Sequence, residues 1–433
     1  MIEIFNIIYL LAGLTLIFAF PPKSVINLTK SSGNNLVETH YINIILVLNL
    51  LLLFSFSKLD LNYIFNLLAA FGFLNFFLNY KSFLIKKNYF FLIFLFFSLI
   101  ISIKIATNPR LEWDAAVNWI YKTKNFYDGF DFSNLRNIPG VLSYPHLGTY
   151  GWALVWKNSL IDHEYTGRIF YAYIYLASIF LIINKFNFEF LSKTIIAFLV
   201  VLVTFDHGLF SGYQEPLMFS LLITLFALTK KANSFHKINI FHFFCILNAN
   251  LILWVKNEGF VFLLIFLVCL FFEKKTNKKI KLLFSASFIS LILIKFFVFD
   301  FYFKENLIGW KGYEFISLEQ IFSLEILQRL PMLMYQLTIV FFKYPIYLVF
   351  LLLSFYLILA KKINYEHKLC FLFFFLNCFL SISIFYFTTD PRWYFHASVG
   401  MDRMLYSTSG VYLYLILDVL NKFFLNNGGN GKN

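Results

Sequence analysis

Apolar runs close to the length of a membrane-spanning helix recur from one end of this chain to the other. A helix needs about 20 residues to cross the roughly 30 Å of hydrocarbon in a bilayer, and lipid offers its backbone N–H and C=O groups no partner outside the helix. Hydrophobic residues make up 60% of the chain and charged residues 14%, which leaves no polar stretch long enough for a soluble domain. We therefore predict an all-α fold, a polytopic transmembrane helix bundle of about 11 to 14 spans with interfacial or re-entrant helices in its outer loops.

Thirteen segments match a spanning helix in length and composition, and short polar loops separate them. Two further apolar stretches, 144–160 and 326–343, must lie along the membrane or dip into it without crossing, because the loops otherwise fail to alternate between the two sides. The predicted spans are 2–20, 41–57, 62–80, 89–105, 169–184, 194–209, 217–229, 238–255, 259–272, 282–302, 345–360, 369–389 and 406–424.

The distribution of charge predicts which side of the membrane each loop faces. Most acidic residues and all seven Trp fall opposite the lysine-rich loops. The formal charge of +13 is spread over short loops instead of one basic stripe, so we predict contact with membrane lipids and no nucleic-acid partner. The lysine-rich loops, which the positive-inside rule places in the cytoplasm, are 81–88, 185–193, 230–237, 273–281 and 361–368.

Every arginine falls on the predicted outer side, whereas the inner loops carry only lysine. Arginine binds phosphate and carboxylate groups through two parallel hydrogen bonds, so this bias favours an anionic ligand at the outer face. The alternative is pairing between these arginines and the many outer acids. The arginines are Arg110, Arg136, Arg168, Arg329, Arg392 and Arg403.

The longest outer loop begins at residue 106 and contains the sequence Glu112-Trp113-Asp114-Ala115. We predict a helix directly after this sequence, with Asp114 as its N-cap. One face of that helix has the composition of a helix that lies in the membrane interface. The residues that share this face at helical spacing are Ala116, Trp119, Ile120, Thr123 and Tyr127.

Several function classes lack the motifs that they require. The chain has no P-loop and no glycine-rich dinucleotide fingerprint, so ATP coupling and a nucleotide-sugar donor have no support. The cysteines all lie in apolar segments, which supports neither a disulfide framework nor a cysteine metal cluster. They are Cys245, Cys269, Cys370 and Cys378.

Five short motifs lie in predicted outer segments of the chain. They are Glu112-Trp113-Asp114-Ala115 with Trp119 and Lys122-Thr123-Lys124 behind it, Tyr144-Pro145-His146, Gly212-Tyr213-Gln214-Glu215-Pro216, Lys256-Asn257-Glu258-Gly259 and Asp402-Arg403. In this order they resemble the GT-C superfamily of polytopic membrane glycosyltransferases, specifically the bacterial branch that uses polyprenyl-phosphate-linked sugars. Two positions depart from the family pattern: Leu147-Gly148-Thr149 stands where more Leu and Pro are expected, and Gln214 replaces a small residue.

The resemblance implies a GT-C-like fold and a domain organisation. The catalytic core would cover residues 89–425, with the first long outer loop and its interfacial helices at 106–168. Residues 1–88 would be N-terminal transmembrane helices of unknown role, and residues 426–433 would form a cytoplasmic tail.

The resemblance also implies a reaction. A hexose or pentose would pass from a polyprenyl-phosphate-linked donor to a hydroxyl of a lipid, glycan or protein acceptor, by inverting single displacement at the periplasmic face of a bacterial inner membrane. Asp114 would be the base, with Glu112 as a second catalytic carboxylate, and Arg403 and Lys256 would bind the donor phosphate. The residues implied to support the site or line the acceptor pocket are Glu258, Glu215, Tyr144, His146, Asp402 and Trp113.

Each charged candidate also has a purely structural interpretation. Asp114 is the residue type that helix N-termini require. Lys256 can neutralise Glu258, and Arg403 can neutralise Asp402, at the rims of their helices.

Cofactor and function class also have alternatives at this point. A divalent metal held by Asp206 and Glu215, with His207 or His146, is the alternative to a metal-free site. A lipid or solute transporter or flippase is the main rival function, although such proteins carry ionisable groups at mid-membrane. A glycan polymerase or ligase is the second rival, and it would also act at the outer face.

Overall fold

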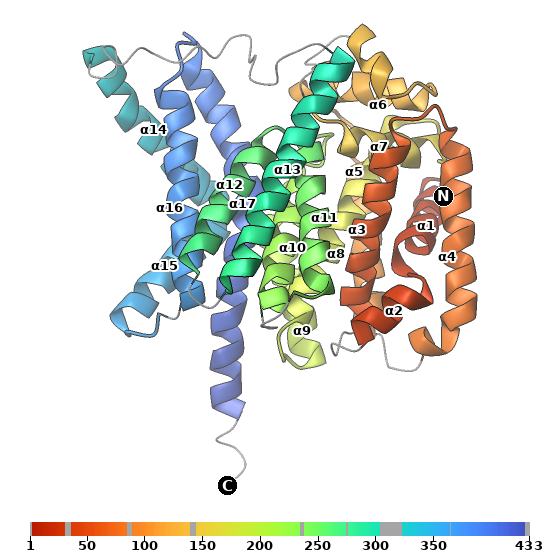
Figure 1. Cartoon of the computed structure of the whole chain (residues 1–433), viewed down its shortest axis with the longest axis horizontal. Coiled ribbons are helices and arrows are strands. Elements are labelled where there is room, and N and C mark those ends of the chain that lie inside the picture. Colours follow the sequence, from red (N-terminus) through yellow and green to blue (C-terminus); the bar gives the residue numbers. More distant parts are fainter. Residues whose placement is uncertain are drawn as a thin grey trace. The chain divides into compact units, whose positions relative to one another are not determined.

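The computed structural model describes residues 2–30, 36–84, 89–138, 144–233, 238–273, 276–303, 323–363 and 365–428. Throughout these residues the secondary structure is helical and no strand is formed, which confirms the all-α prediction (Figure 1). Parts of four predicted inner loops lie outside the described residues, as do most of the segment between 303 and 323 and the end of the predicted tail. The chain divides into two compact units, unit 1 from Met1 to Asn257 and unit 2 from Glu258 to Asn433.

Unit 1 is built around helix α8 (Ile169–Asn184). Every residue of α8 from Ile169 to Ile183 is buried, and helices from both halves of the unit pack around it. Because α1 and α3 are among these helices, the boundary predicted after residue 88 does not coincide with the boundary between units. The other helices of unit 1 are α1 (Ile2–Ala19), α2 (Lys23–Lys30), α3 (Leu36–Phe54), α4 (Leu61–Leu84), α5 (Tyr89–Ala106), α6 (Ile120–Tyr127), α7 (Leu147–Lys157), α9 (Phe190–Thr204), α10 (Glu215–Asn233) and α11 (Ile240–Val255), with shorter turns at Ala115–Trp119, Phe132–Asn137 and Glu164–Arg168.

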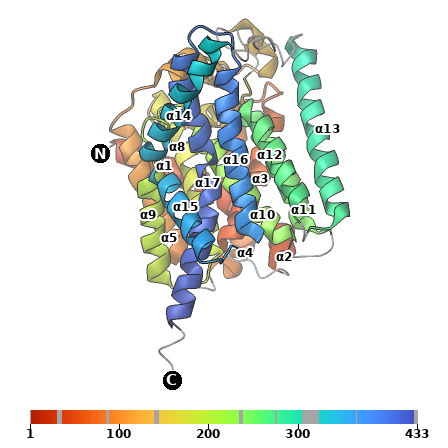
Figure 2. The ribbon, with the colours of Figure 1, turned by 90° about the vertical axis from the view of Figure 1, so that its left-hand side faces the viewer.

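Unit 2 is organised by its last helix, α17 (Trp393–Gly428). Helices α14, α15 and α16 all pack against α17, and α12 packs between α13 and α16 (Figure 2). The bounds of these helices are α12 (Glu258–Phe272), α13 (Lys278–Phe303), α14 (Leu324–Lys343), α15 (Pro345–Leu359) and α16 (Tyr365–Tyr386).

Seven helices among the described residues are long and apolar enough to cross a membrane, which makes the chain an integral membrane protein. Each of them matches a predicted span. A strongly bent pair, Glu325–Lys343 with Pro345–Leu359, adds an eighth if its halves form one span. The seven are Ile2–Ala19, Val37–Phe54, Leu61–Asn79, Tyr89–Thr107, Glu164–Asn184, Lys278–Phe303 and His367–Tyr386.

Five further predicted spans are helices that fall short of these criteria. Within the described residues, seven of the expected 11 to 14 crossings are supported, or eight with the bent pair. Helices α9, α11 and α12 have 15, 16 and 15 residues. At 1.5 Å per residue they are about 22 to 24 Å long, less than the roughly 30 Å hydrocarbon core. The predicted span 217–229 lies in α10, where charged residues flank a short apolar run. The predicted span 406–424 lies in α17, where Asp418 and Lys422 interrupt the apolar run.

The two stretches that were predicted not to cross also form helices. The first is α7, whose 11 residues are too few to cross, as predicted. The second is α14, which meets α15 at an angle of 97° next to Tyr344. Such a bend is the geometry of a broken span or of a re-entrant segment.

Polar contacts in unit 1 join segments that the sequence assigns to the same side of the membrane. On the predicted outer side, the backbone N–H of Leu160 donates to Asn6 Oδ1 at 2.8 Å. On the predicted inner side, Lys231 Nζ lies 2.6 Å from Glu38 Oε2. These contacts place Leu160 beside Asn6 and Lys231 beside Glu38, which agrees with the predicted sides of these four residues. The cytoplasmic location of the lysine-rich end stays a prediction.

We expect a reporter that is active only in the cytoplasm to be active when fused after Asn277 and silent when fused after Asp131. The reason is that Asn277 lies in a lysine-rich loop, whereas Asp131 lies in the acidic loop on the opposite side. Paired fusions to alkaline phosphatase, which is active only outside the cytoplasm, provide the reciprocal measurement. Reversed activities at both positions would contradict the predicted orientation.

Candidate active site

Asp114 stands at the start of a π-helical turn, Ala115–Trp119, that leads into α6. Its backbone is already helical, with φ −62° and ψ −35°, and its side chain makes no capping hydrogen bond to the described backbone. Asn118 Nδ2 approaches Asp114 Oδ1 at 3.5 Å, which is a long contact. The prediction that the Asp114 side chain caps the helix is therefore wrong. Single π-turns occur frequently at functional sites.

The π-turn also changes which face of the helix is buried. Of the residues predicted to face the membrane interface, Trp119 and Thr123 are buried in the protein and Ala116 is exposed, while Lys122 and Phe126 are also buried. A π-turn holds about one residue more than an α-turn, so a spacing calculated for a regular α-helix misplaces the residues beside it.

The Asp114 segment is attached to the loop that precedes α10. The backbone N–H of Glu112 donates to the carbonyl of Ser211 at 3.3 Å. The next residue, Gly212, has a φ of +101°, and a Cβ at this position would lie 2.8 Å from the Cβ of Ala115. Only glycine combines this φ with so close an approach. Two motifs that are about a hundred residues apart in sequence thus lie side by side.

Glu215, the first residue of α10, forms a buried ion pair with Lys256 at the end of α11. Lys256 Nζ lies 2.9 Å from Glu215 Oε1, and both side chains are almost fully excluded from solvent. The structural alternative for Lys256 was neutralisation of Glu258. The structure pairs Lys256 with Glu215, because α10 and α11 pack against each other in unit 1. A buried pair of this kind strongly resists the loss of either charge.

The Tyr-Pro-His motif packs against the π-turn and α6. The rings of Tyr144 and Trp119 lie 5.3 Å apart, and Lys122 Nζ donates to the carbonyl of Tyr144. Lys122 was quoted in the sequence motif without a role, and it proves to be a buried tether between two motifs.

His146 is enclosed in an aromatic core. Its Nε2 lies 2.6 Å from Ser55 Oγ, and its ring contacts Phe126, Phe132 and Trp254. No part of the side chain reaches the surface. His146 therefore supports the site through packing and is not placed to touch an acceptor.

The two departures from the family pattern touch each other. Gln214 is fully buried, and its Nε2 donates to the hydroxyl of Tyr171 at 2.9 Å. Its Oε1 lies directly over Gly148, where an added Cβ would be only 1.7 Å away. The larger side chain at 214 is thus accommodated by the absence of a side chain at 148.

Gly148→Ala is expected to destabilise the protein by about 1–3 kcal/mol, the usual cost of overpacking a core. The effect should be much smaller in a Gln214→Ala background, because the colliding amide is gone. Thermal unfolding in detergent of both single variants and the double variant measures this coupling. Additive effects of the two substitutions would contradict it.

In unit 2, Asp402 pairs with a cation that the sequence analysis did not select. Lys343 Nζ at the end of α14 lies 2.7 Å from Asp402 Oδ2. The structural alternative for Arg403 was neutralisation of Asp402, but Lys343 supplies a charge for that carboxylate. The sequence feature that could have identified Lys343 is its position directly before Tyr344-Pro345, where one helix ends and the next begins.

The residues proposed as metal ligands do not form a cluster. Among the described residues, no group of three or more His, Cys, Asp and Glu side chains is arranged to hold a metal ion. Asp206 Oδ1 accepts a hydrogen bond from the N–H of Gly208 at 2.9 Å, as in a local turn. Burial lowers the pKa of His207 below its ordinary value, so its ring is neutral at pH 7.

Three of the arginines have partners within the protein, in line with the alternative to ligand binding. Arg329 Nη1 donates to the carbonyl of Thr388 at 2.6 Å, and Arg392 lies 3.6 Å from Asp390. Arg168, with no exposed surface, pairs with Glu164 at 3.0 Å. A count of outer arginines therefore overstates the number that can meet a ligand.

No family model, no curated protein and no solved structure matches this chain. The functional argument consequently depends on the residues and contacts described above. In unit 1, these contacts connect the Glu112–Ala115 motif to the loop before Glu215, and Glu215 to Lys256.

Proposed function

We propose that this protein is a membrane glycosyltransferase that moves a sugar from a polyprenyl-phosphate-linked donor to an acceptor hydroxyl. The observation that carries the proposal is the attachment of the Asp114 segment to the Ser211–Gly212 turn, which brings two of the family-like motifs together. A packing requirement explains Gly212 and Ala115. The carboxylate of Asp114 does not cap the helix and is partly exposed, so a substrate can reach it.

Asp114 is suited to act as the general base. Its carboxylate is partly exposed at the end of unit 1, and a base must be within hydrogen-bond reach of the hydroxyl proton that it removes. Trp113 beside it is 71% exposed and offers an aromatic surface to the sugar or to the lipid. A single base on one side of the sugar fits inversion by single displacement.

Cations are needed for the phosphate that leaves the sugar. Arg403 is our candidate in unit 2, because a guanidinium can hold phosphate at two points. Lys256 is our candidate in unit 1, and its pair with Glu215 fixes the ammonium group at the end of α11. The proposal places the reaction at the periplasmic face of a bacterial inner membrane, with a lipid, glycan or protein as acceptor.

A second candidate function, transport of a lipid or solute, is favoured by two observations in unit 2. The α14–α15 pair is bent by 97°, and the Lys343–Asp402 pair lies next to the bend. Transporters bind substrates at broken helices and charged residues of this kind. Lys295, which is buried within α13, is a further ionisable group in a span.

The deciding experiment uses the purified protein in detergent and in vesicles. A glycosyltransferase transfers labelled sugar from a polyprenyl-phosphate donor to the acceptor in detergent, where no compartments exist. A transporter is inactive in detergent and moves the lipid or sugar only across the vesicle membrane. Asp114→Asn serves as the internal test of the catalytic assignment.

A further inference from the structure

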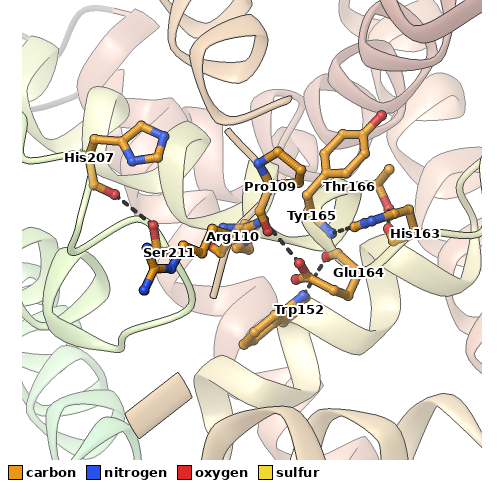
Figure 3. A network of polar contacts seen from close by, with 10 residues as sticks. Pro109, Arg110, Trp152, His163, Glu164, Tyr165, Thr166, His207 and Ser211 are labelled. Carbon is orange, nitrogen blue, oxygen red and sulfur yellow. Dashed lines mark hydrogen bonds and ion pairs between the residues drawn. The ribbon is translucent and has the colours of Figure 1, made fainter. Parts of the chain in front are cut away.

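Arg168 makes more contacts with the backbone before Asp114 than with any acidic partner. Its Nη2 donates to the carbonyl of Pro109 at 2.6 Å, and its Nη1 donates to the carbonyl of Arg110 at 3.2 Å. Nη2 also donates to Glu164 at 3.0 Å, one turn earlier in the chain. Figure 3 shows Glu164 beside Pro109 and Trp152. The guanidinium thus connects the start of α8 to a point four residues before Asp114.

Glu164, the acidic partner of Arg168, is itself bonded to a buried tryptophan. The carbonyl of Glu164 accepts a hydrogen bond from Trp152 Nε1 at 2.7 Å. The ring of Trp152 is fully buried and approaches Gly212, where an added Cβ would lie 2.8 Å from Trp152 Cη2. Gly212 adjoins Ser211, which accepts the hydrogen bond of Glu112. The segment before Asp114 is therefore attached at two points, to the Arg168 guanidinium and to the Ser211 carbonyl. Trp152 packs beside both attachment points.

We propose that Arg168 is a positioning residue, which fixes the carbonyls of Pro109 and Arg110 and so holds Asp114 in place for the reaction. The inference rests on the proposed function for its catalytic part. Its structural part, the attachment of the loop, depends on the contacts alone. Arg168 is thus a clamp on the catalytic segment and not one of the arginines that bind an anionic ligand.

Arginine is required for this arrangement because of its shape. The guanidinium presents several donors in a rigid plane, so it can serve two carbonyls and one carboxylate together. A lysine at 168 keeps the positive charge beside Glu164 but has a single ammonium nitrogen on a flexible chain. Arg168→Lys should therefore preserve the buried ion pair and lose the hydrogen bonds to the carbonyls of Pro109 and Arg110.

The first readout is limited trypsin cleavage, which does not depend on activity. Arg110 and Arg136 are both exposed, and only the Arg110 segment is held by Arg168. In Arg168→Lys we expect cleavage after Arg110 to become at least about tenfold faster, because proteolysis requires local opening. Cleavage after Arg136 in the same sample should keep its wild-type rate. Mass spectrometry of the fragments measures both rates.

The second readout separates catalysis from binding. Arg168→Lys is expected to lower kcat by on the order of ten- to a hundredfold while the KM for the donor changes little, since a misplaced base slows the chemical step. Arg392→Lys is the matched control, the same change at an exposed arginine of unit 2. It should leave the sugar-transfer rate and the cleavage after Arg110 unchanged.

The outcomes distinguish this inference from the proposed function. A folded Arg168→Lys protein with wild-type cleavage after Arg110 would overturn the clamp. Faster cleavage after Arg110 in a protein whose wild-type form transfers no sugar would uphold the clamp and reject the glycosyltransferase. If Arg168→Lys does not fold, the double variant Arg168→Met with Glu164→Gln removes both buried charges. The same increase in cleavage is then expected, and its absence would overturn the clamp.

Discussion

Asp114→Asn is expected to abolish sugar transfer while the protein remains folded and inserted in the membrane. Asparagine has nearly the same size, but near neutral pH its amide cannot take up the proton that the acceptor hydroxyl loses. Loss of a general base lowers the rate on the order of 10²- to 10⁴-fold. Because asparagine keeps the size of the side chain and its Oδ1 can still accept from Asn118, the substitution should hardly change the temperature of unfolding.

Two matched variants control for this result. Glu112→Gln, two residues away, should cause a smaller loss of transfer, because that carboxylate has only a supporting role. Asp128→Asn changes an exposed carboxylate at the other end of α6 and should have no effect. Transfer from a polyprenyl-phosphate sugar, detergent-extracted yield and thermal stability are measured for all variants. Near-normal turnover in Asp114→Asn would refute its assignment as the base.

Lys256→Met is expected to destabilise unit 1 by about 3–5 kcal/mol, the range found when one partner of a buried ion pair is removed. The cause is the carboxylate of Glu215, which is fully buried and accepts from Lys256 at 2.9 Å. Methionine fills most of the space of the lysine chain but provides no charge. The expected result is a large fall in unfolding temperature and in the yield of folded protein.

Adding Glu215→Gln to Lys256→Met should recover most of the stability, because the double variant no longer buries a single charge. This pair of measurements also separates the two roles of Lys256. If Lys256 binds the donor phosphate, the double variant will be stable yet have a raised KM for the donor. A stable double variant with wild-type kinetics would assign Lys256 to structure alone, and equal instability of the single and double variants would contradict the ion pair.

The candidate site was only partly predictable from the sequence. Asp114 was selected because its type and its neighbours resemble a family motif, and the structure removed the competing role of helix cap. Lys122 and Arg168 were not assigned a positioning role, since nothing in their local sequence shows that their side chains reach the carbonyls of Tyr144 and Pro109. Lysine and arginine side chains commonly donate to backbone carbonyls, but the tertiary fold determines which carbonyl they reach.

The helical fold and seven membrane-length helices followed from the sequence by itself, because lipid obliges each apolar segment to satisfy its own backbone hydrogen bonds. Only the tertiary structure decided the partners of the charged and packed residues. Lys256 and Glu215 are 41 positions apart, and Gly148 meets Gln214 across a still larger separation. Local pattern carries no information on such contacts, since they depend on which helices pack together and at what register. The π-turn at Asp114 was decided in the same way, because one extra residue in a turn changes which side chains face the core.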